Sequence, residues 1–246
     1  MLDYEKTFEL RGSDFDRWNH LRPSSVLDFF QEVAARHAEQ MHMGFFDLIG
    51  QKMIWVLTRV KYEIVGQVRR NEHVTVRTWP QPPRHVIYRR EYTIEGEDGR
   101  RLVNGASEWV IAHSEKRSVL APGNIYPEGE EFCTELLFDR RFRHVPPFET
   151  EEKGEIVRPS FTHLDLNGHV NNTHYASYVM DAIRPDRDTE ISRFQIDYHR
   201  ELLLGEPVEI QLQRQDGCIL AQGVSSEGER MFACKLDMKK RDDTEI

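Results

Sequence analysis

Two stretches of the chain carry apolar side chains at helical spacing. The first begins at Pro23 and ends near Gly44, with inward positions at Val26, Phe29, Phe30, Val33, Ala34 and His37. The second begins at Asn172, with inward positions at Tyr175, Tyr178, Val179 and Ala182. Because residues three and four apart share one face of a helix, both stretches predict amphipathic helices.

Shorter apolar segments, typical of strands, follow each predicted helix. We expect strands at 53–64, 72–79, 86–95 and 101–112 after the first helix, and at 193–198, 207–214, 218–224 and 231–238 after the second. The run Gly96-Glu97-Asp98-Gly99 predicts a hairpin turn. One helix followed by an antiparallel meander, made twice, predicts an α+β fold of two layers, in each of which the sheet wraps the helix.

The chain also repeats itself at two fixed shifts. At a shift of 149 residues (165 − 16), Asp16, His20, Ser24 and Phe29 match Asp165, His169, Thr173 and Tyr178. At a shift of 134 (193 − 59), Arg59, Val60, Glu63 and Glu72 match Arg193, Phe194, Asp197 and Glu206. Such ungapped registers indicate an internal duplication. We therefore expect domains at 1–121 and 154–246, joined by a linker at 122–153 that is rich in Pro and Glu.

The most unusual stretch is LDLNGHVNNTHY, residues 164–175, just before the second helix. Asp165, Asn167 and His169 stand at alternate positions, and an extended segment would place all three side chains on one face. A carboxylate, an amide and an imidazole on one face are suited to acid–base chemistry. Each also has an ordinary alternative: Asp165 as a helix cap or turn residue, Asn167 as a turn former and His169 as a structural histidine.

Composition narrows the function classes. With 39% hydrophobic and 30% charged residues, the chain has the composition of a soluble globular protein. The net charge of −9 argues against general affinity for nucleic acid. Three widely spaced cysteines, Cys133, Cys218 and Cys234, predict reduced thiols in a cytoplasmic protein. The beginning MLDYEKTFEL is charged and lacks a long apolar run, so we expect neither a targeting segment nor a membrane span.

These residues together resemble the acyl-acyl-carrier-protein thioesterases, tandem hotdog-fold enzymes of fatty acid synthesis. The resemblance covers nearly the whole chain and rests on the ordered set WVLTR (55–59), Thr78-Trp79, ASEWV (106–110), the motif D-x-N-x-H-V-N-N, and Tyr198-His199-Arg200-Glu201, which is similar to the family's Y-x-R-E. Plant members often carry Cys directly after that Glu. Here the position is Leu202, so a thiol nucleophile is excluded there.

The resemblance implies two tandem hotdog domains and hydrolysis of fatty acyl-carrier-protein thioesters to free fatty acid and carrier. It implies a catalytic set of Asp165, Asn167, His169 and Glu201, in which either Asp165 attacks the carbonyl or a carboxylate activates water. We expect Asn171 and Asn172 to shape the second helix, whose positive end would polarise the carbonyl. The partner implied is acyl carrier protein, without nucleic acid or membrane, and a homodimer is left open.

No metal or cofactor is expected, because His163 and His174 match no zinc spacing and no nucleotide-binding pattern occurs. We interpret Arg140, Arg141 and Arg143 as a solvated face, with docking of an acidic carrier protein as the alternative. Phe29, Phe30, Tyr175 and Tyr178 are predicted as helix-face core, with an acyl pocket as the alternative.

The two copies differ at the candidate site. The repeat shifts place Trp18 and Gln67 in the first copy where the second has Asn167 and Glu201. We therefore expect one active site per chain, in the second copy, and a first domain that is catalytically degenerate and holds the acyl chain. The rival functions are an acyl-CoA thioesterase, a hotdog 3-hydroxyacyl thioester dehydratase and a non-catalytic acyl-carrier binding module.

Overall fold

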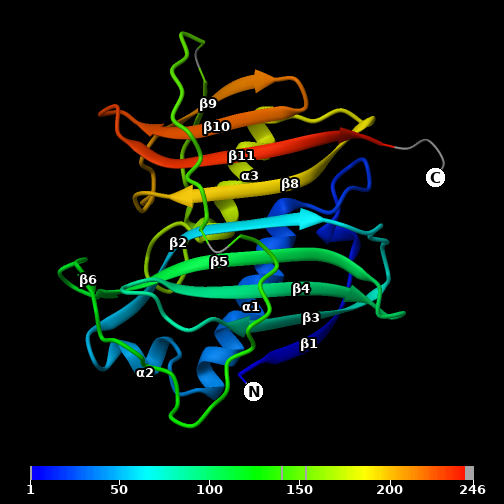
Figure 1. Ribbon diagram of the computed structural model, residues 1–246. Coiled ribbons are helices and arrows are strands. Elements are labelled where there is room, and N and C mark those ends of the chain that lie inside the picture. The colour runs from blue at the N-terminus through cyan, green and yellow to red at the C-terminus, as the bar shows by residue number, and fades with distance from the viewer. Residues whose placement is uncertain (1, 140, 153, 242–246) are drawn as a thin grey trace. The chain divides into compact units, whose positions relative to one another are not determined.

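The computed structural model describes residues 2–139, 141–152 and 154–241 (Figure 1). The chain forms two compact units. The first comprises Met1–Gly12 and Asp28–Phe142, and the second comprises Ser13–Leu27 and Arg143–Ile246. Among the helices of the described residues, none is long and apolar enough to cross a membrane.

The first unit is an antiparallel sheet with a long helix, α1, behind it (Figure 1). The strand order is β1-β3-β4-β5-β2, with β6 paired to β5. Their bounds are β1 Tyr4–Glu9, β2 Met53–Ile64, β3 His73–Pro80, β4 Tyr88–Gly96, β5 Arg101–His113 and β6 Val119–Leu120; the helices are α1 Pro23–Gln40 and α2 Phe45–Ile49.

Helix α1 packs closely on this sheet through an aromatic side chain. Phe30 stacks on Tyr92 of β4, with 4.3 Å between ring centroids. A Cβ atom on Gly105 of β5 would lie 2.2 Å from the Phe30 ring, so this strand position needs glycine. Phe30 and Tyr92 are both buried, as the helical pattern of the sequence predicts for Phe30.

The second unit repeats this plan, with helix α3 behind a sheet of order β8-β11-β10-β9-β7 (Figure 1). The bounds are β7 Glu155–Val157, α3 Asn172–Ile183, β8 Thr189–Tyr198, β9 Val208–Gln215, β10 Cys218–Ser225 and β11 Arg230–Lys240. Tyr175 of α3 packs edge-on against Phe232 of β11, with ring centroids 5.2 Å apart. Tyr175 and Tyr178, which the helical pattern of the sequence places on the apolar face of this helix, are both buried.

Matching hydrogen bonds confirm the internal duplication. A single turn of 3-10 helix occurs at Gly12–Asp14 and again at Phe161–His163, a shift of 149. The bond from the Asp16 N–H to the His20 carbonyl recurs from Asp165 to His169, both at 2.8 Å. The bond from the Asn71 N–H to the Leu10 carbonyl recurs from Gly205 to Pro159, both at 2.9 Å. Asn71 and Gly205, which the shift of 134 aligns, also share a positive φ, 61° and 75°.

The structure adds strands that the sequence did not predict. β1 carries polar residues at alternate positions, and β7 has only three residues, two of them exposed. Both lie at sheet edges, where a strand is half-solvated and its apolar signal is weak. β8 also begins at Thr189, four residues before the predicted start at 193 (193 − 189).

The segment 122–153, predicted as a linker, contributes buried side chains to both units. Tyr126 and Phe142 are buried in the first unit, and Val145 is buried in the second. The Val145 N–H donates to Asp197 of β8 at 2.9 Å. Domain limits at 121/122 and 153/154 stay a prediction, and Arg140 of the predicted basic cluster lies outside the described residues.

Candidate active site

Asp165, Asn167 and His169 lie in a tight loop that folds back on itself. The Asp165 N–H donates to the His169 carbonyl at 2.8 Å, and the Gly168 N–H donates to the Asp165 carbonyl at 3.0 Å. Gly168 has φ +78°, a left-handed conformation that favours glycine. The three residues therefore converge through a turn, and the extended segment considered from their alternate spacing is wrong.

The Asp165 carboxylate is held by the loop. Its Oδ1 accepts the Asn167 N–H at 2.8 Å, and the Asn167 Nδ2 lies 3.5 Å from Oδ2. This is the turn-forming role that the sequence left open for both residues. Asn167 is exposed, so its side-chain amide remains available to a substrate.

His169 is paired with Glu201, which is distant in sequence. The His169 Nε2 lies 3.0 Å from the Glu201 Oε2. The His169 side chain is 14% exposed, whereas that of Glu201 is 41% exposed. The pair therefore joins a sheltered imidazole to a carboxylate that water can reach. All four predicted residues belong to the second unit, as two contacting pairs connected through the Asp165–His169 loop.

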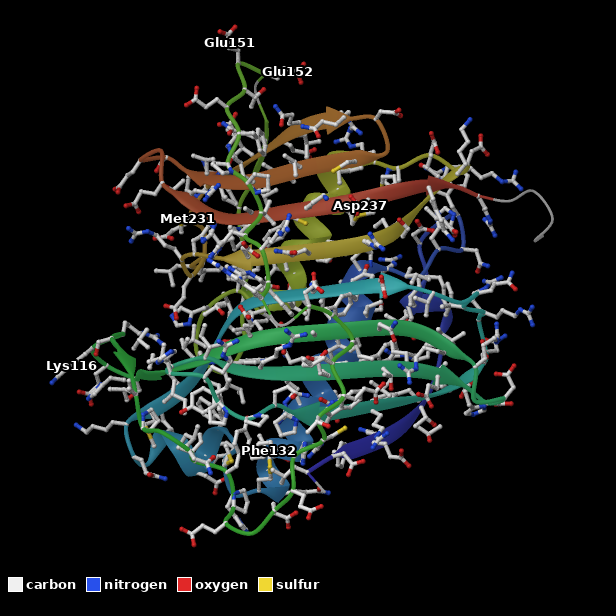
Figure 2. The ribbon with its side chains drawn as sticks, in the orientation of Figure 1. Lys116, Phe132, Glu151, Glu152, Met231 and Asp237 are labelled. Atoms are coloured by element: carbon white, nitrogen blue, oxygen red, sulfur yellow. The ribbon has the colours of Figure 1, made fainter. Side chains whose placement is uncertain are left out.

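Three hydrogen bonds fix the segment that carries Glu201. The N–H groups of His199 and Arg200 donate to the carbonyl of Met231 on β11, at 2.9 and 3.0 Å. Figure 2 labels Met231 at one end of that strand. The Leu202 N–H donates to the Tyr175 hydroxyl on α3 at 2.9 Å. Together these bonds hold Glu201 from both sides.

Tyr175 is a site residue whose role the sequence did not reveal, because its helical position indicated only core packing. Burial raises the pKa of the Tyr175 hydroxyl, and the charges of Glu201 and Asp165 raise it further. Both carboxylates therefore act on one buried hydroxyl, which is neutral at physiological pH. The signal in the sequence was a tyrosine where phenylalanine would fill the core equally well.

Helix α3 begins directly after the loop. Its N-cap is Asn171, whose side chain accepts the Thr173 N–H at 3.1 Å, as the sequence predicted. The carbonyl of Asn172 accepts the Tyr198 hydroxyl at 2.9 Å. The positive end of this helix therefore lies three residues (172 − 169) beyond His169 in the chain.

His163 and His174 lie beside the loop, where they contact each other. Their ring centroids are 4.7 Å apart, and the Tyr178 hydroxyl lies 2.7 Å from the His163 Nδ1. Burial, together with the charge of His163, lowers the pKa of His174. Within the part of the chain that the structure describes, no three His, Cys, Asp or Glu side chains are grouped to hold a metal ion.

Two family models match the chain: the acyl-ACP thioesterase N-terminal domain over residues 1–124 and the acyl-ACP thioesterase C-terminal domain over residues 148–246. The chain belongs to the acyl-ACP thioesterase family. The oleoyl-acyl carrier protein thioesterase 1, chloroplastic, of Arabidopsis thaliana is 25% identical over 219 residues, which cover 81% of this chain and 60% of that protein. The palmitoyl-acyl carrier protein thioesterase, chloroplastic, of Gossypium hirsutum is 23% identical over 224 residues, covering 81% and 52%. The chain thus spans little more than half the length of these relatives.

Solved structures confirm the fold of this family member. The 12:0-ACP thioesterase from Umbellularia californica superposes with a TM-score of 0.86 at 18% identity, covering 98% of each chain. An acyl-ACP thioesterase from Bacteroides thetaiotaomicron gives 0.84 at 19% identity, covering 97% of this chain and 98% of that one. The predicted α+β fold of two tandem hotdog domains is confirmed.

The first copy in this thioesterase-family chain keeps the loop but forms different side-chain pairs. Asp16 Oδ1 accepts the Trp18 and His20 N–H groups at 2.8 and 2.9 Å, and Asp16 Oδ2 lies 3.4 Å from His20 Nδ1. Although burial alone would raise the pKa of Asp16, these hydrogen bonds from His20 and Trp18 lower it. The His20 Nε2 is buried without a hydrogen-bond partner among the described residues, whereas the equivalent nitrogen of His169 meets Glu201.

Trp18 and Gln67 have structural contacts where the second copy has candidate catalytic groups. The Trp18 indole N–H donates to the Pro185 carbonyl at 3.1 Å. The Gln67 Oε1 accepts a hydrogen bond from Arg69 at 2.8 Å. The first copy therefore retains the loop but has no counterpart of the His169–Glu201 pair at these positions, and its catalytic degeneracy stays a prediction.

The thiols lie outside this constellation. Leu202, which directly follows Glu201, is buried. Cys234 is fully buried, and burial raises its pKa far above the usual range of a thiol. Burial also raises the pKa of Cys218. Both cysteines are therefore protonated and poorly nucleophilic at neutral pH.

Proposed function

We propose that this protein hydrolyses the thioester that links a fatty acyl chain to acyl carrier protein, releasing free fatty acid and holo-carrier protein. The observation that supports this proposal is the 3.0 Å pair of His169 and Glu201 beside the Asp165–Asn167 loop. Family membership and the names of the relatives, which are acyl-carrier-protein thioesterases, support the substrate class.

Glu201 and His169 have the positions that a water-activation mechanism requires. The half-exposed Glu201 takes a proton from water, and the water oxygen attacks the thioester carbonyl carbon. As the tetrahedral intermediate collapses, the carbon–sulfur bond breaks and the leaving thiolate takes a proton from His169. The Glu201 proton returns to His169, and the products are the fatty acid and the carrier thiol.

Asp165 and Asn167 position the substrate in this mechanism. Both Asp165 oxygens already face Asn167, at 2.8 and 3.5 Å, so direct attack by Asp165 would first break the loop's own contacts. We therefore favour activated water over a covalent Asp165 intermediate. The exposed Asn167 amide and the positive end of α3 stabilise the negative charge that develops on the carbonyl oxygen.

The test is a product analysis with purified protein and a fatty acyl-carrier substrate. We expect free fatty acid and free carrier thiol in equal amounts, and the variant Glu201→Gln should lower kcat by about a hundredfold. Faster turnover of matched acyl-CoA would indicate the CoA thioesterase. An enoyl product with its thioester intact would indicate a dehydratase, and binding without release would indicate a carrier-binding module.

We place this reaction in fatty acid biosynthesis. We expect the protein to act in the cytoplasm without a membrane partner. If the protein self-associates, we expect a homodimer. The plant relatives carry the word chloroplastic in their names, so the cytoplasmic location stays a prediction for this chain. Cell fractionation and sedimentation of the purified protein test these two points.

A further inference from the structure

Four large apolar side chains are exposed on the segments that carry the candidate site. They are Phe161 (79% exposed), Leu166 (82%), Leu203 (41%) and Leu204 (54%), which we call the apolar rim. Leu166 lies between Asp165 and Asn167, while Leu203 and Leu204 follow Glu201 closely.

The two segments of the apolar rim are hydrogen-bonded to each other. The Gly205 N–H donates to the Pro159 carbonyl, and the Val170 N–H donates to the Leu202 carbonyl, both at 2.9 Å. The rim residues of one segment therefore lie beside those of the other, around Glu201 and the Asp165 loop.

The internal repeat shows that the fold does not require these apolar side chains. The shifts of 149 and 134 align Phe161, Leu166, Leu203 and Leu204 with Gly12, Arg17, Arg69 and Arg70, all of which are exposed. The matching bonds of Asn71 to Leu10 and of Gly205 to Pro159 fix this alignment. Every rim position is thus apolar in the second copy, which carries the candidate site, and is glycine or arginine in the first copy. Exposed apolar patches of this kind mark interaction sites.

We propose that the apolar rim is the docking surface for the carrier protein that delivers the acyl thioester; this rests on the proposed function. A carrier protein that presents a thioester to His169 and Glu201 comes within reach of the surface around them. Burying exposed leucine and phenylalanine side chains against an apolar surface of a partner protein stabilises the complex. The phosphates of a nucleotide carrier such as CoA would instead be matched by arginine, which the first copy has at these positions and the second lacks.

The experiment compares one acyl group carried as a thioester on two thiols: the acyl carrier protein and N-acetylcysteamine, a small thiol without a protein. The rim variant combines Phe161→Ser, Leu166→Ser, Leu203→Ser and Leu204→Ser. Phe46→Ser is the matched control, because Phe46 on α2 is also 79% exposed. The rim variant should lose about tenfold or more in kcat/KM on the carrier substrate, through KM, and less than about twofold on the small thioester. The control should change neither.

Equal losses on both substrates would overturn the proposal, since the rim would then serve the reacting groups themselves. Unchanged kinetics of the rim variant on the carrier substrate would also overturn the proposal. If the rim variant were then a monomer and the unaltered protein a dimer, the rim would be an interface with a second copy of this chain. If the unaltered protein hydrolysed neither thioester, the proposed function would fail, and titration with acyl-carrier protein would still test the rim. Equal binding by the unaltered protein and the rim variant would refute docking at this surface.

Discussion

At the scale of single residues, one of the three hydrogen bonds that fix the Glu201 segment comes from a buried hydroxyl on helix α3. Tyr175 accepts the Leu202 N–H at 2.9 Å, and Leu202 is the residue directly after Glu201. Tyr198 supplies a comparison on β8, since its hydroxyl donates to the Asn172 carbonyl at 2.9 Å, at the start of helix α3. Comparing the two separates positioning of the catalytic pair from ordinary packing.

Tyr175→Phe should therefore lower kcat by about tenfold with little change in KM, because Glu201 loses a constraint on its distance from His169. Tyr198→Phe should leave kcat near that of the unaltered protein. Tyr175→Phe should lose about 1–3 kcal/mol of stability, because it leaves the buried Leu202 N–H unpaired. Tyr198→Phe should lose about 1 kcal/mol, because it removes one hydrogen bond to a carbonyl that also belongs to helix α3. The measurements are steady-state kinetics and urea unfolding. Equal kcat losses in the two variants would show that Tyr175 has no special role.

Cysteine chemistry should be dispensable. Replacing Cys133 and Cys218 by Ser and the buried Cys234 by Ala should leave kcat within about tenfold, because none lies in the His169–Glu201 constellation. Thermal melting shows whether the variant is folded. A folded triple variant without activity would mean that a thiol performs the reaction.

The site could be predicted only where its residues are close in sequence. Asp165, Asn167 and His169 lie within one loop, so their unusual composition was visible as a motif. Glu201 lies 32 residues after His169 (201 − 169), and only the family resemblance nominated it. Tyr175 was assigned to the core, because the helical pattern shows that a side chain is buried but does not show which backbone group its hydroxyl meets.

At the scale of elements, helices α1 and α3 and the strands β2 to β5 and β8 to β11 could be predicted, because each carries an apolar pattern, whereas the five-residue helix α2 could not. The edge strands β1 and β7 could not, since an edge exposes one side of the strand to water. Helix α1 also carries a polar residue on its apolar face, His37, which the sequence counted among the inward positions. It is buried and lies 2.9 Å, through Nδ1, from Arg90 of β4.

His37 should make the first unit sensitive to acid. Burial, followed by the charge of Arg90, lowers the pKa of His37 from 6.5 to about 3. As the pH falls below 6.5, His37 therefore takes up a proton in the unfolded chain. In the folded chain it does so only near pH 3. Between these values, stability should fall by about 1.4 kcal/mol per pH unit from this group as pH decreases.

His37→Gln removes this titration. The free energy of unfolding is measured in urea at pH 7.5 and at pH 5.0. Its decrease between these pH values should be larger in the unaltered protein than in the variant by about 2 kcal/mol. The comparison concerns the difference between the two pH values, so a constant destabilisation of the variant does not affect it. Identical pH dependence in both proteins would show that His37 is not the responsible group.

At the scale of the whole molecule, a duplicated chain has one chemical constellation. Both copies retain the same loop, with a 2.8 Å bond from Asp16 to His20 and from Asp165 to His169. Only the second copy pairs its histidine with Glu201; in the first, His20 lies 3.4 Å from Asp16. The apolar rim follows the same asymmetry, so the proposed chemistry and the proposed docking surface both belong to the second copy.

The most direct test of this account is a comparison of kcat and KM for four variants on one acyl-carrier substrate, with melting temperatures. Asp165→Ala and His169→Ala should each lower kcat by about a hundredfold or more, the scale for an acid–base or positioning group at the reacting centre. Asp16→Ala and His20→Ala should affect stability or KM and leave kcat within about tenfold. If the folded Asp16 and His20 variants lose as much kcat as their counterparts, the account of a single site in the second copy is wrong.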